Sequence, residues 1–250
     1  MQVTILGAGT AVPAARHSPA GVYVQVAGEH VLLDAGAGTL QRLERSGAPW
    51  HALDRIFLTH FHLDHCLDLA SILFAYRLPQ LKRRKPLTVY GPPGLRRLYQ
   101  RLNAAFSGWI TPRGFRLVLR ELLETTLRLP GYRVSTRRMR HYATNAIGYR
   151  LDARGASLAY SGDTDVCRGV VALGQGADAL ILECSVTDEQ KVVGHLTPSE
   201  CGAIAAAAGC RRLVLSHFYP VFRGYDIRRR VRRAFRGRVT LARDLTSLSL

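Results

Sequence analysis

A short run of residues after one apolar strand constrains this chain more than any other segment. Residues 56–58 read as a strand, and after Thr59 the chain continues His60-Phe61-His62-Leu63-Asp64-His65. Alternate side chains of an extended segment point to the same side, so His60 and His62 can bind one metal ion. The Asp-His pair follows where the chain turns toward a helix, and it can face a second ion. Zinc suits this mixture of imidazole and carboxylate best.

The rest of the chain alternates short apolar segments with longer segments of helical spacing. No linker or low-complexity stretch interrupts them, which favours a single α/β domain over residues 1–250. The predicted strands are 3–6, 22–26, 31–33, 56–58, 87–90, 146–151, 157–160, 179–182, 213–215 and 239–241. The predicted helices are 67–76, 95–106, 170–173, 199–208 and 227–235.

Two of these helices carry more detailed signals. Thr197-Pro198-Ser199-Glu200 offers a capping threonine, a proline at the first helical position and a glutamate that reaches back to the cap, which predicts a helix start. Gly209 would end that helix. In helix 227–235 the apolar residues share one side. The other sides carry Arg228, Arg229, Arg230, Arg232, Arg233 and Arg236.

The charge of the chain leaves two interpretations open. A net charge of +17 favours a polyanionic partner such as RNA. Only three of the 35 basic residues are lysine, however, namely Lys82, Lys85 and Lys191. A general preference for arginine, spread over every solvated surface, would give the same total.

Other bulk features bear on location and redox state. No run of 18 or more uncharged apolar residues is present, so we expect no membrane-spanning helix. The chain opens with a strand-like segment and not with a signal peptide, so we expect a cytoplasmic protein. Five cysteines, without any CxxC spacing, are expected to be buried free thiols. They are Cys66, Cys167, Cys184, Cys201 and Cys210.

The histidine motif and several further segments resemble the metallo-β-lactamase superfamily. The HxHxDH run after Leu-Thr is the signature of that family. Segments 5–10, 32–36, 161–164 and 215–218 resemble its other motifs, in its order. The resemblance implies a four-layer αββα sandwich with two divalent ions at one edge, zinc first, with Mn²⁺ or Fe²⁺ as alternatives. It implies one ion on His60, His62 and His141, a second on Asp64, His65 and His217, and Asp163 as a bridge between them.

The same resemblance implies roles in catalysis. A hydroxide that bridges the two ions would be the nucleophile, and Asp34 and Thr59 would orient the ligands. Segments 182–185 and 194–197 resemble the branch that contains ribonuclease Z and related phosphodiesterases. In that branch His195 would protonate the departing oxygen and Glu183 would orient it. Asp64, His195 and Glu183 are therefore the residues expected to carry catalysis. His195 could instead be a helix-entry histidine without a catalytic role.

The sequence departs from ribonuclease Z in one respect. Those enzymes carry an arm that grips tRNA, inserted before the Ser/Thr-Gly-Asp segment. Here ten residues separate Arg150 from Ser161, enough for a hairpin only. In addition, Asp165 stands where a basic residue is expected. Segments 78–85 and 106–116 are predicted to cover the metals and set specificity.

These features favour a phosphodiesterase acting on a modest-sized phosphodiester, such as a cyclic nucleotide or a nucleotide-derived ester. A tRNA 3′-processing endonuclease without the arm is one alternative, and an arylsulfatase or other ester hydrolase is another. A nucleic-acid-binding module with a structural metal site is a third. The resemblance is compatible with a homodimer, because dimers are common in the family, but the sequence does not define the oligomeric state.

Overall fold

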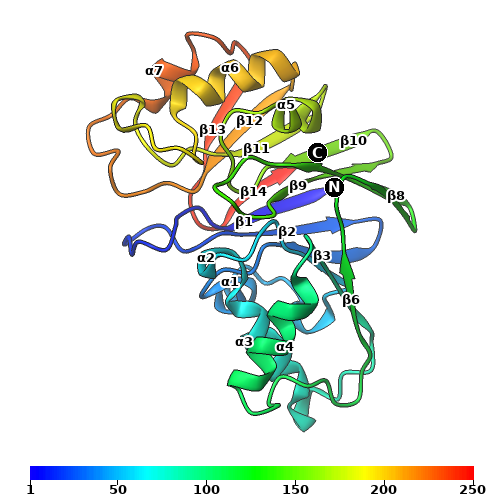
Figure 1. Ribbon diagram of the computed structural model, residues 1–250. Coiled ribbons are helices and arrows are strands. Elements are labelled where there is room, and N and C mark those ends of the chain that lie inside the picture. Colours follow the sequence, from blue (N-terminus) through cyan, green and yellow to red (C-terminus); the bar gives the residue numbers. More distant parts are fainter.

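Two seven-stranded sheets form the centre of the protein (Figure 1). The computed structural model describes all residues 1–250. The first sheet has the order β14-β1-β2-β3-β4-β5-β6. Its strands are β1 (Gln2–Gly7), β2 (Gly21–Val26), β3 (Glu29–Leu33), β4 (Arg55–Phe57), β5 (Leu87–Gly91), β6 (Leu117–Glu121) and β14 (Thr246–Ser249). The second has the order β13-β12-β11-β10-β9-β8-β7. Its strands are β7 (Thr126–Leu129), β8 (Tyr132–Arg138), β9 (Ile147–Ala153), β10 (Ala156–Tyr160), β11 (Ala179–Glu183), β12 (Arg212–Ser216) and β13 (Arg238–Leu241).

Each sheet is antiparallel in one half and parallel in the other. In the first sheet β14, β1, β2 and β3 pair antiparallel, whereas β3, β4, β5 and β6 pair parallel. In the second, β7 to β10 pair antiparallel and β10 to β13 pair parallel. Because the carboxyl ends of parallel strands lie at one edge of a sheet, the loops after them form a common rim.

Helices cover the outer face of each sheet (Figure 1). The first sheet carries α1 (Thr39–Arg45), η1 (Trp50–Ala52), α2 (Leu63–Cys66), α3 (Asp68–Arg77), η2 (Pro79–Leu81) and α4 (Leu95–Ala105). The second sheet carries α5 (Arg168–Gly174), η3 (Asp188–Gln190), α6 (Pro198–Ala208) and α7 (Ile227–Val231).

Three apolar clusters correspond to the interfaces between these layers. One lies between the sheets and includes Phe57 and Tyr149. A second joins the first sheet to α1 and α3, and a third joins the second sheet to α5, α6 and α7. The layers therefore run helix, sheet, sheet, helix, and the predicted α/β fold, a four-layer αββα sandwich, is confirmed. That residues 1–250 form a single domain stays a prediction.

All ten predicted strands are present, but four others were not predicted. In β8, for example, Tyr132, Val134 and Thr136 point inward while Arg133 and Arg138 are exposed. This alternation of apolar and charged side chains suits a strand with one solvated face. The charged positions interrupt the apolar run, so the segment lacks the pattern by which the other strands were predicted. By contrast, β11 is buried along its whole length because both of its faces are covered.

The helix signals were partly right. Thr197 and Glu200 form the predicted capping box at the start of α6, and Gly209 ends the helix with a left-handed backbone (φ 63°). The prediction of a helix over residues 227–235 is wrong in its second half, because α7 ends at Val231. After Val231 some backbone hydrogen bonds span three residues in place of four, as from Ala234 N–H to Val231 O, so the chain forms a tighter turn. Phe235 follows this turn and is buried in the core.

The hairpin before Ser161, the cysteines and the lengths of the helices bear on three further expectations. The ten residues before Ser161 form the predicted hairpin, in which β9 pairs antiparallel with β10. All five cysteines are free; four are buried, whereas Cys167 is only half-buried, because it precedes α5 at the surface. None of the helices has the length and apolar character needed to cross a bilayer.

Candidate metal centre

The rims of the two sheets meet, and the seven side chains expected to hold metal lie together there. His60, His62, Asp64 and His65 follow β4 of the first sheet. His141, Asp163 and His217 follow strands β8, β10 and β12 of the second. Donor atoms of His60, His62, His141 and Asp163 lie within 4.8 Å of one another, as do those of Asp64, His65 and His217.

The carboxylate of Asp163 lies between the two groups. Its Oδ2 is 3.8 Å from His60 Nε2 and 3.7 Å from His141 Nε2. Its Oδ1 is 3.2 Å from His65 Nε2 and 3.4 Å from His217 Nε2. One oxygen thus faces each group, which is the arrangement needed for a carboxylate that bridges two cations.

Most of the imidazoles are held from behind through Nδ1. His65 Nδ1 is 2.8 Å from Asp34 Oδ2, and His141 Nδ1 is 2.8 Å from the carbonyl oxygen of Gly194. His217 Nδ1 is 3.0 Å from Ser185 Oγ. Such outer partners fix the ring orientation and leave Nε2 directed at the centre.

Asp34 is the main support of the first-sheet half. Its carboxylate accepts hydrogen bonds from the N–H and Oγ1 of Thr59, at 2.7 and 2.9 Å, and from Tyr160 Oη at 2.7 Å. Asp34 and Thr59 lie where the sequence placed them, behind the metal-facing side chains. No local pattern in the sequence indicates the role of Tyr160, which reaches Asp34 from the opposite sheet.

The protonation states of four of these side chains favour cation binding. Burial lowers the pKa of His60 and of His141, so both rings are neutral and can offer a lone pair. Burial acts to raise the pKa of Asp163, but the neighbouring His217 and His65 outweigh it and hold the carboxyl ionised. Asp64 is likewise held ionised, because its hydrogen bond with His217 outweighs the effect of burial on its pKa. Neutral imidazole and ionised carboxylate are the forms that bind metals. His65 differs: burial acts to lower its pKa, but the carboxylates of Asp163 and Asp34 outweigh it and raise that pKa, so this ring has to release a proton before it binds a cation.

Two buried atoms of the centre, His60 Nε2 and Asp163 Oδ1, make no hydrogen bond within the protein. The rings of His65 and His217 nevertheless lie 3.2 and 3.4 Å from Asp163 Oδ1. An unpaired buried polar atom destabilises a fold, so such atoms call for an explanation. A pair of divalent cations would satisfy both, and the residues present therefore fit such a pair.

A close approach between the two sheets sets the width of the centre. Gly162 has a left-handed backbone (φ 59°), and a Cβ atom on it would lie 2.6 Å from the Cβ and Oγ1 of Thr59. No other residue fits at that distance without a shift. Asp163 is thereby brought next to the histidines of the other sheet.

His195 and Glu183 lie together beside the cluster. Glu183 ends β11, and its carboxylate is 3.0 Å from His195 Nδ1. The same carboxylate accepts the N–H of Thr164 and of Leu196, and the hydroxyl of Ser185. Burial acts to lower the pKa of His195, but the hydrogen bond and charge of Glu183 outweigh it and raise that pKa. His195 Nδ1 also lies 4.0 Å from Asp163 Oδ2, so the pair adjoins the centre.

Comparison with known proteins identifies the family. Residues 29–218 match the family model described as beta-lactamase superfamily domain. The chain belongs to the beta-lactamase superfamily. The family predicted from the sequence is therefore confirmed, with the motif segments in the expected order.

Individual members of the superfamily are similar along the whole chain. A ribonuclease Z of Streptomyces avermitilis is 29% identical over 294 aligned positions, which cover 98% of this chain and 96% of that protein. The alignment is longer than this chain, so the Streptomyces protein contains segments that are absent here. The metallo-beta-lactamase fold protein YhfI of Bacillus subtilis superposes with a TM-score of 0.84 at 24% identity, covering 99% of this chain and 98% of YhfI. Human tRNase Z, short form, superposes with a TM-score of 0.81 at 28% identity, covering 100% and 99%.

Asp165, which replaces an expected basic residue, faces inward in this superfamily member. It is buried, and its carboxylate accepts the N–H of Gly194 at 3.0 Å and pairs with Lys191 Nζ at 2.8 Å. Lys191 also bonds to the carbonyl oxygen of His195 and to Glu200 of the α6 cap. The pair therefore holds the loop that carries His195, and the Asp165 carboxylate is engaged by these bonds. Nothing in the local sequence around Lys191 indicates this role.

The two segments expected to cover the metals lie elsewhere. Arg83 donates to the carbonyl oxygens of Leu53 and Pro86, at the amino ends of β4 and β5, whereas the metal-facing side chains follow the carboxyl end of β4. Segment 106–116 follows the far end of α4, whose first turn at Gly94 lies against Phe61. Both specificity predictions are therefore wrong, because helices α3 and α4 carry the chain away from the rim.

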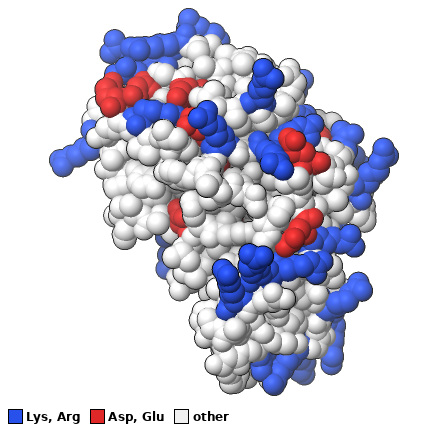
Figure 2. All heavy atoms as spheres, in the orientation of Figure 1, with Lys and Arg blue, Asp and Glu red and all other residues white.

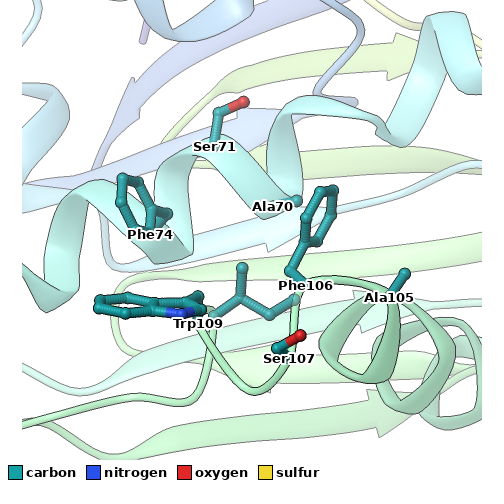
Figure 3. Close-up of a pocket in the computed structure, with 8 residues that line it drawn as sticks. Ala70, Ser71, Phe74, Ala105, Phe106, Ser107 and Trp109 are labelled. Carbon is teal, nitrogen blue, oxygen red and sulfur yellow. The ribbon is translucent and has the colours of Figure 1, made fainter.

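Segment 106–116 instead helps to line an apolar hollow of about 500 Å³ between α3 and the end of α4 (Figure 3). Phe74, Phe106 and Trp109 lie around it and are each partly exposed. None of the metal-facing residues lines it. Its apolar lining offers no group for hydrolysis, so it is not the catalytic site.

Proposed function

We propose that this protein is a dinuclear metal-dependent phosphodiesterase. One observation carries the proposal: the Asp163 carboxylate lies between two groups of histidine and aspartate side chains, with one oxygen toward each. His60, His62 and His141 would hold one ion, and Asp64, His65 and His217 the other. Zinc suits these donors, and Mn²⁺ and Fe²⁺ are alternatives.

The chemistry divides between the ions and the protein. When bound, two divalent cations supply a nucleophile that is ionised at neutral pH and polarise the phosphoryl oxygens. The protein holds Asp64 and Asp163 ionised and keeps His60 and His141 neutral, and its buried outer partners keep the rings in place. His62 is the exposed member of the set, so the substrate would approach from its side.

His195 is the proposed proton donor to the departing oxygen. Its Nδ1 is engaged by Glu183, which leaves Nε2 as the ring nitrogen that can carry a proton to the substrate. An alkoxide is a poor leaving group, so phosphodiester cleavage requires an acid at this place. Glu183 touches no reacting atom in this scheme; it orients His195 and favours its charged form. Asp64 contributes by positioning the second ion.

Elemental analysis together with hydrolysis of bis(p-nitrophenyl) phosphate tests the proposal. We expect about two metal ions per chain. On a phosphodiester with an alkoxide leaving group, His195→Ala should lower kcat by roughly 10²- to 10⁴-fold, the usual contribution of acid-base catalysis, with the metal content unchanged. On bis(p-nitrophenyl) phosphate the loss should be much smaller, because p-nitrophenolate leaves without a proton. The matched control is His51→Ala, a histidine of η1 outside the cluster. If the metal-loaded protein cleaves carboxylic or sulfate esters but no phosphodiester, the proposal is wrong and the arylsulfatase or ester hydrolase alternative stands.

A second candidate is tRNA 3′ processing, favoured by the names of two relatives, ribonuclease Z and tRNase Z. The short β9–β10 hairpin offers no arm, so arginines would have to bind the RNA. Figure 2 shows Lys and Arg on several separate parts of one face, one of them at the end that carries α7. On α7 itself, Arg230 is neutralised by Glu189 and Asp188. Scattered charge supports general attraction to polyanions better than a shaped RNA site.

A gel-shift assay with precursor tRNA separates the two candidates. RNA binding through phosphates falls steeply with salt concentration. Binding below micromolar concentration at moderate salt, followed by 3′ cleavage, would favour the second candidate. Absence of binding at micromolar protein would dispose of it and leave the small phosphodiester as substrate.

We further propose that the protein is a cytoplasmic homodimer. Exposed apolar side chains gather around the hollow of Figure 3, at Phe74, Phe106 and Trp109, with 43%, 45% and 56% of their surface accessible. A grouping of this kind on a water-exposed surface commonly marks a contact with another protein.

A further inference from the structure

A second hollow, on the side of the second sheet, is lined in part by Phe218 and Tyr219, the two residues that follow His217. It has a volume of about 300 Å³, at the lower end of the range for small-molecule sites. Aromatic rings and arginines dominate its lining. These residues are His17, Phe218, Tyr219, Phe222, Arg223 and Arg243.

Tyr219 connects this hollow to the catalytic residues. Its ring centroid lies 6.0 Å from that of His195 and 6.1 Å from that of His217, edge-on in both cases. Tyr219 is also one of the residues that line the hollow. The hollow and the proposed proton donor therefore share Tyr219 as a neighbour, which is close enough for both to meet one substrate.

The walls of the hollow are flat and apolar. The rings of His17 and Phe218 lie 5.6 Å apart with 36° between their planes, and Phe222 meets Phe218 edge-on at 5.8 Å. Burial lowers the pKa of His17, so its ring is uncharged at neutral pH. Both His17 and Phe222 are partly exposed, and so they present ring surface to a ligand. Rings of this kind bind planar aromatic groups by stacking.

The rim of the hollow is positively charged. Arg223 and Arg243 are both exposed, and neither has a carboxylate within 4.0 Å. Asp244, the acidic neighbour of Arg243, is already occupied: it accepts the N–H of Ala8 and of Ser18 and pairs with Arg42. These bonds fix the loop that carries His17, and they leave both guanidinium groups free for an anion.

We propose that this hollow binds the nucleobase of a nucleotide phosphodiester, with Arg223 and Arg243 at its sugar-phosphate portion. The inference rests on the proposed function, because it places the base beside the scissile phosphate. Stacking of one base on aromatic side chains strengthens binding by about 5- to 150-fold. The substrate class would thus be nucleotide esters, in preference to phosphodiesters that carry only aliphatic groups.

Calorimetric titration with products tests the site without depending on catalysis. The full-length protein is titrated with thymidine 5′-monophosphate and with deoxyribose 5-phosphate, which differ only by the base. We expect the first to bind at least tenfold more tightly. Phe222→Leu, which keeps an apolar side chain but removes the ring, should abolish this difference. Phe115→Leu is the matched control, a partly buried aromatic before β6 that packs against the cluster of the other sheet and should leave the difference unchanged.

The charged rim is tested in the same titration. Arg223→Gln should weaken the binding of both ligands severalfold, because both carry the phosphate. The control is Arg154→Gln, an exposed arginine in the turn between β9 and β10. Circular dichroism of each variant establishes that it is folded.

Hydrolysis then separates this inference from the proposed function. Thymidine 5′-(p-nitrophenyl phosphate) and methyl p-nitrophenyl phosphate share a leaving group, and kcat/KM should be at least tenfold higher for the first. If both esters are cleaved at equal rates, and the two products bind equally in the wild type, the nucleobase site is refuted while the phosphodiesterase stands. If neither ester is cleaved but the monophosphate binds through Phe222, the proposed function fails and the site remains. Loss of methyl ester cleavage in Phe222→Leu would also contradict the inference.

Discussion

Removing the bound cations should lower the melting temperature of this protein by a calculable amount. His60 Nε2 and Asp163 Oδ1 are buried without any hydrogen-bond partner when no cation is present. Each such atom destabilises a fold by about 1 to 3 kcal/mol, so the pair contributes roughly 2 to 6 kcal/mol. In a domain of this size 1 kcal/mol shifts the melting temperature by about 2 to 4 °C. The expected loss is therefore roughly 4 to 24 °C.

Differential scanning calorimetry of protein stripped with a chelator, and then titrated with zinc or manganese, measures this shift. The melting temperature should rise with cation concentration, because ligands that bind only the folded state stabilise it by mass action. Asp163→Ala removes the carboxylate shared by the two groups, so most of the cation-dependent rise should disappear. An unchanged melting temperature, in protein shown by elemental analysis to have gained two ions, would refute the argument from unpaired buried atoms.

Three further predictions concern other parts of the molecule. Lys191→Met should lower kcat tenfold or more with little change in KM or metal content, since Lys191 positions the His195 loop. Lys191→Arg keeps the charge and should retain much of the wild-type kcat. Equal losses of kcat in both variants would argue against a role for the charge. Burial acts to raise the pKa of Asp178, but its hydrogen bonds from Ser157 outweigh this and lower it, so its stabilising effect is complete above about pH 4 and is lost as pH falls through the folded-state pKa. Thermal melts of Asp178→Asn should thus show a deficit at pH 7 that shrinks below pH 4, and a constant deficit would contradict that reasoning. Trp109→Glu should convert the proposed dimer to a monomer in light scattering after gel filtration, whereas a monomeric wild type would end the dimer proposal.

The part of the candidate site that lies within one short segment could be predicted from the sequence. His60, His62, Asp64 and His65 lie within six residues of one strand end, so their spacing alone indicates a metal site. His141, Asp163 and His217 have no such local pattern, and only the order of the family motifs connected them with the cluster.

What the sequence could not indicate depends on contacts between distant segments. Lys191 reaches Asp165 and the cap of α6, and Tyr160 reaches Asp34 across the interface between the sheets. Similarly, β14 pairs with β1 at the opposite end of the chain. Its short, half-polar segment acquires strand structure from that partner, not from its own composition. The wrongly placed specificity loops have the same origin, because the direction in which α3 and α4 leave the rim is a tertiary property.

The contact between Gly162 and Thr59 bears on any attempt to engineer this protein. A residue that binds no ligand sets the spacing of the two halves, so a library that varies only the histidines and aspartates samples donor chemistry at one fixed separation of the two donor groups. A side chain at position 162 would be strained even beside a smaller residue at position 59, because the backbone of Gly162 is left-handed. Engineering for a larger cation pair should therefore keep Gly162 and vary the donor residues and their outer partners.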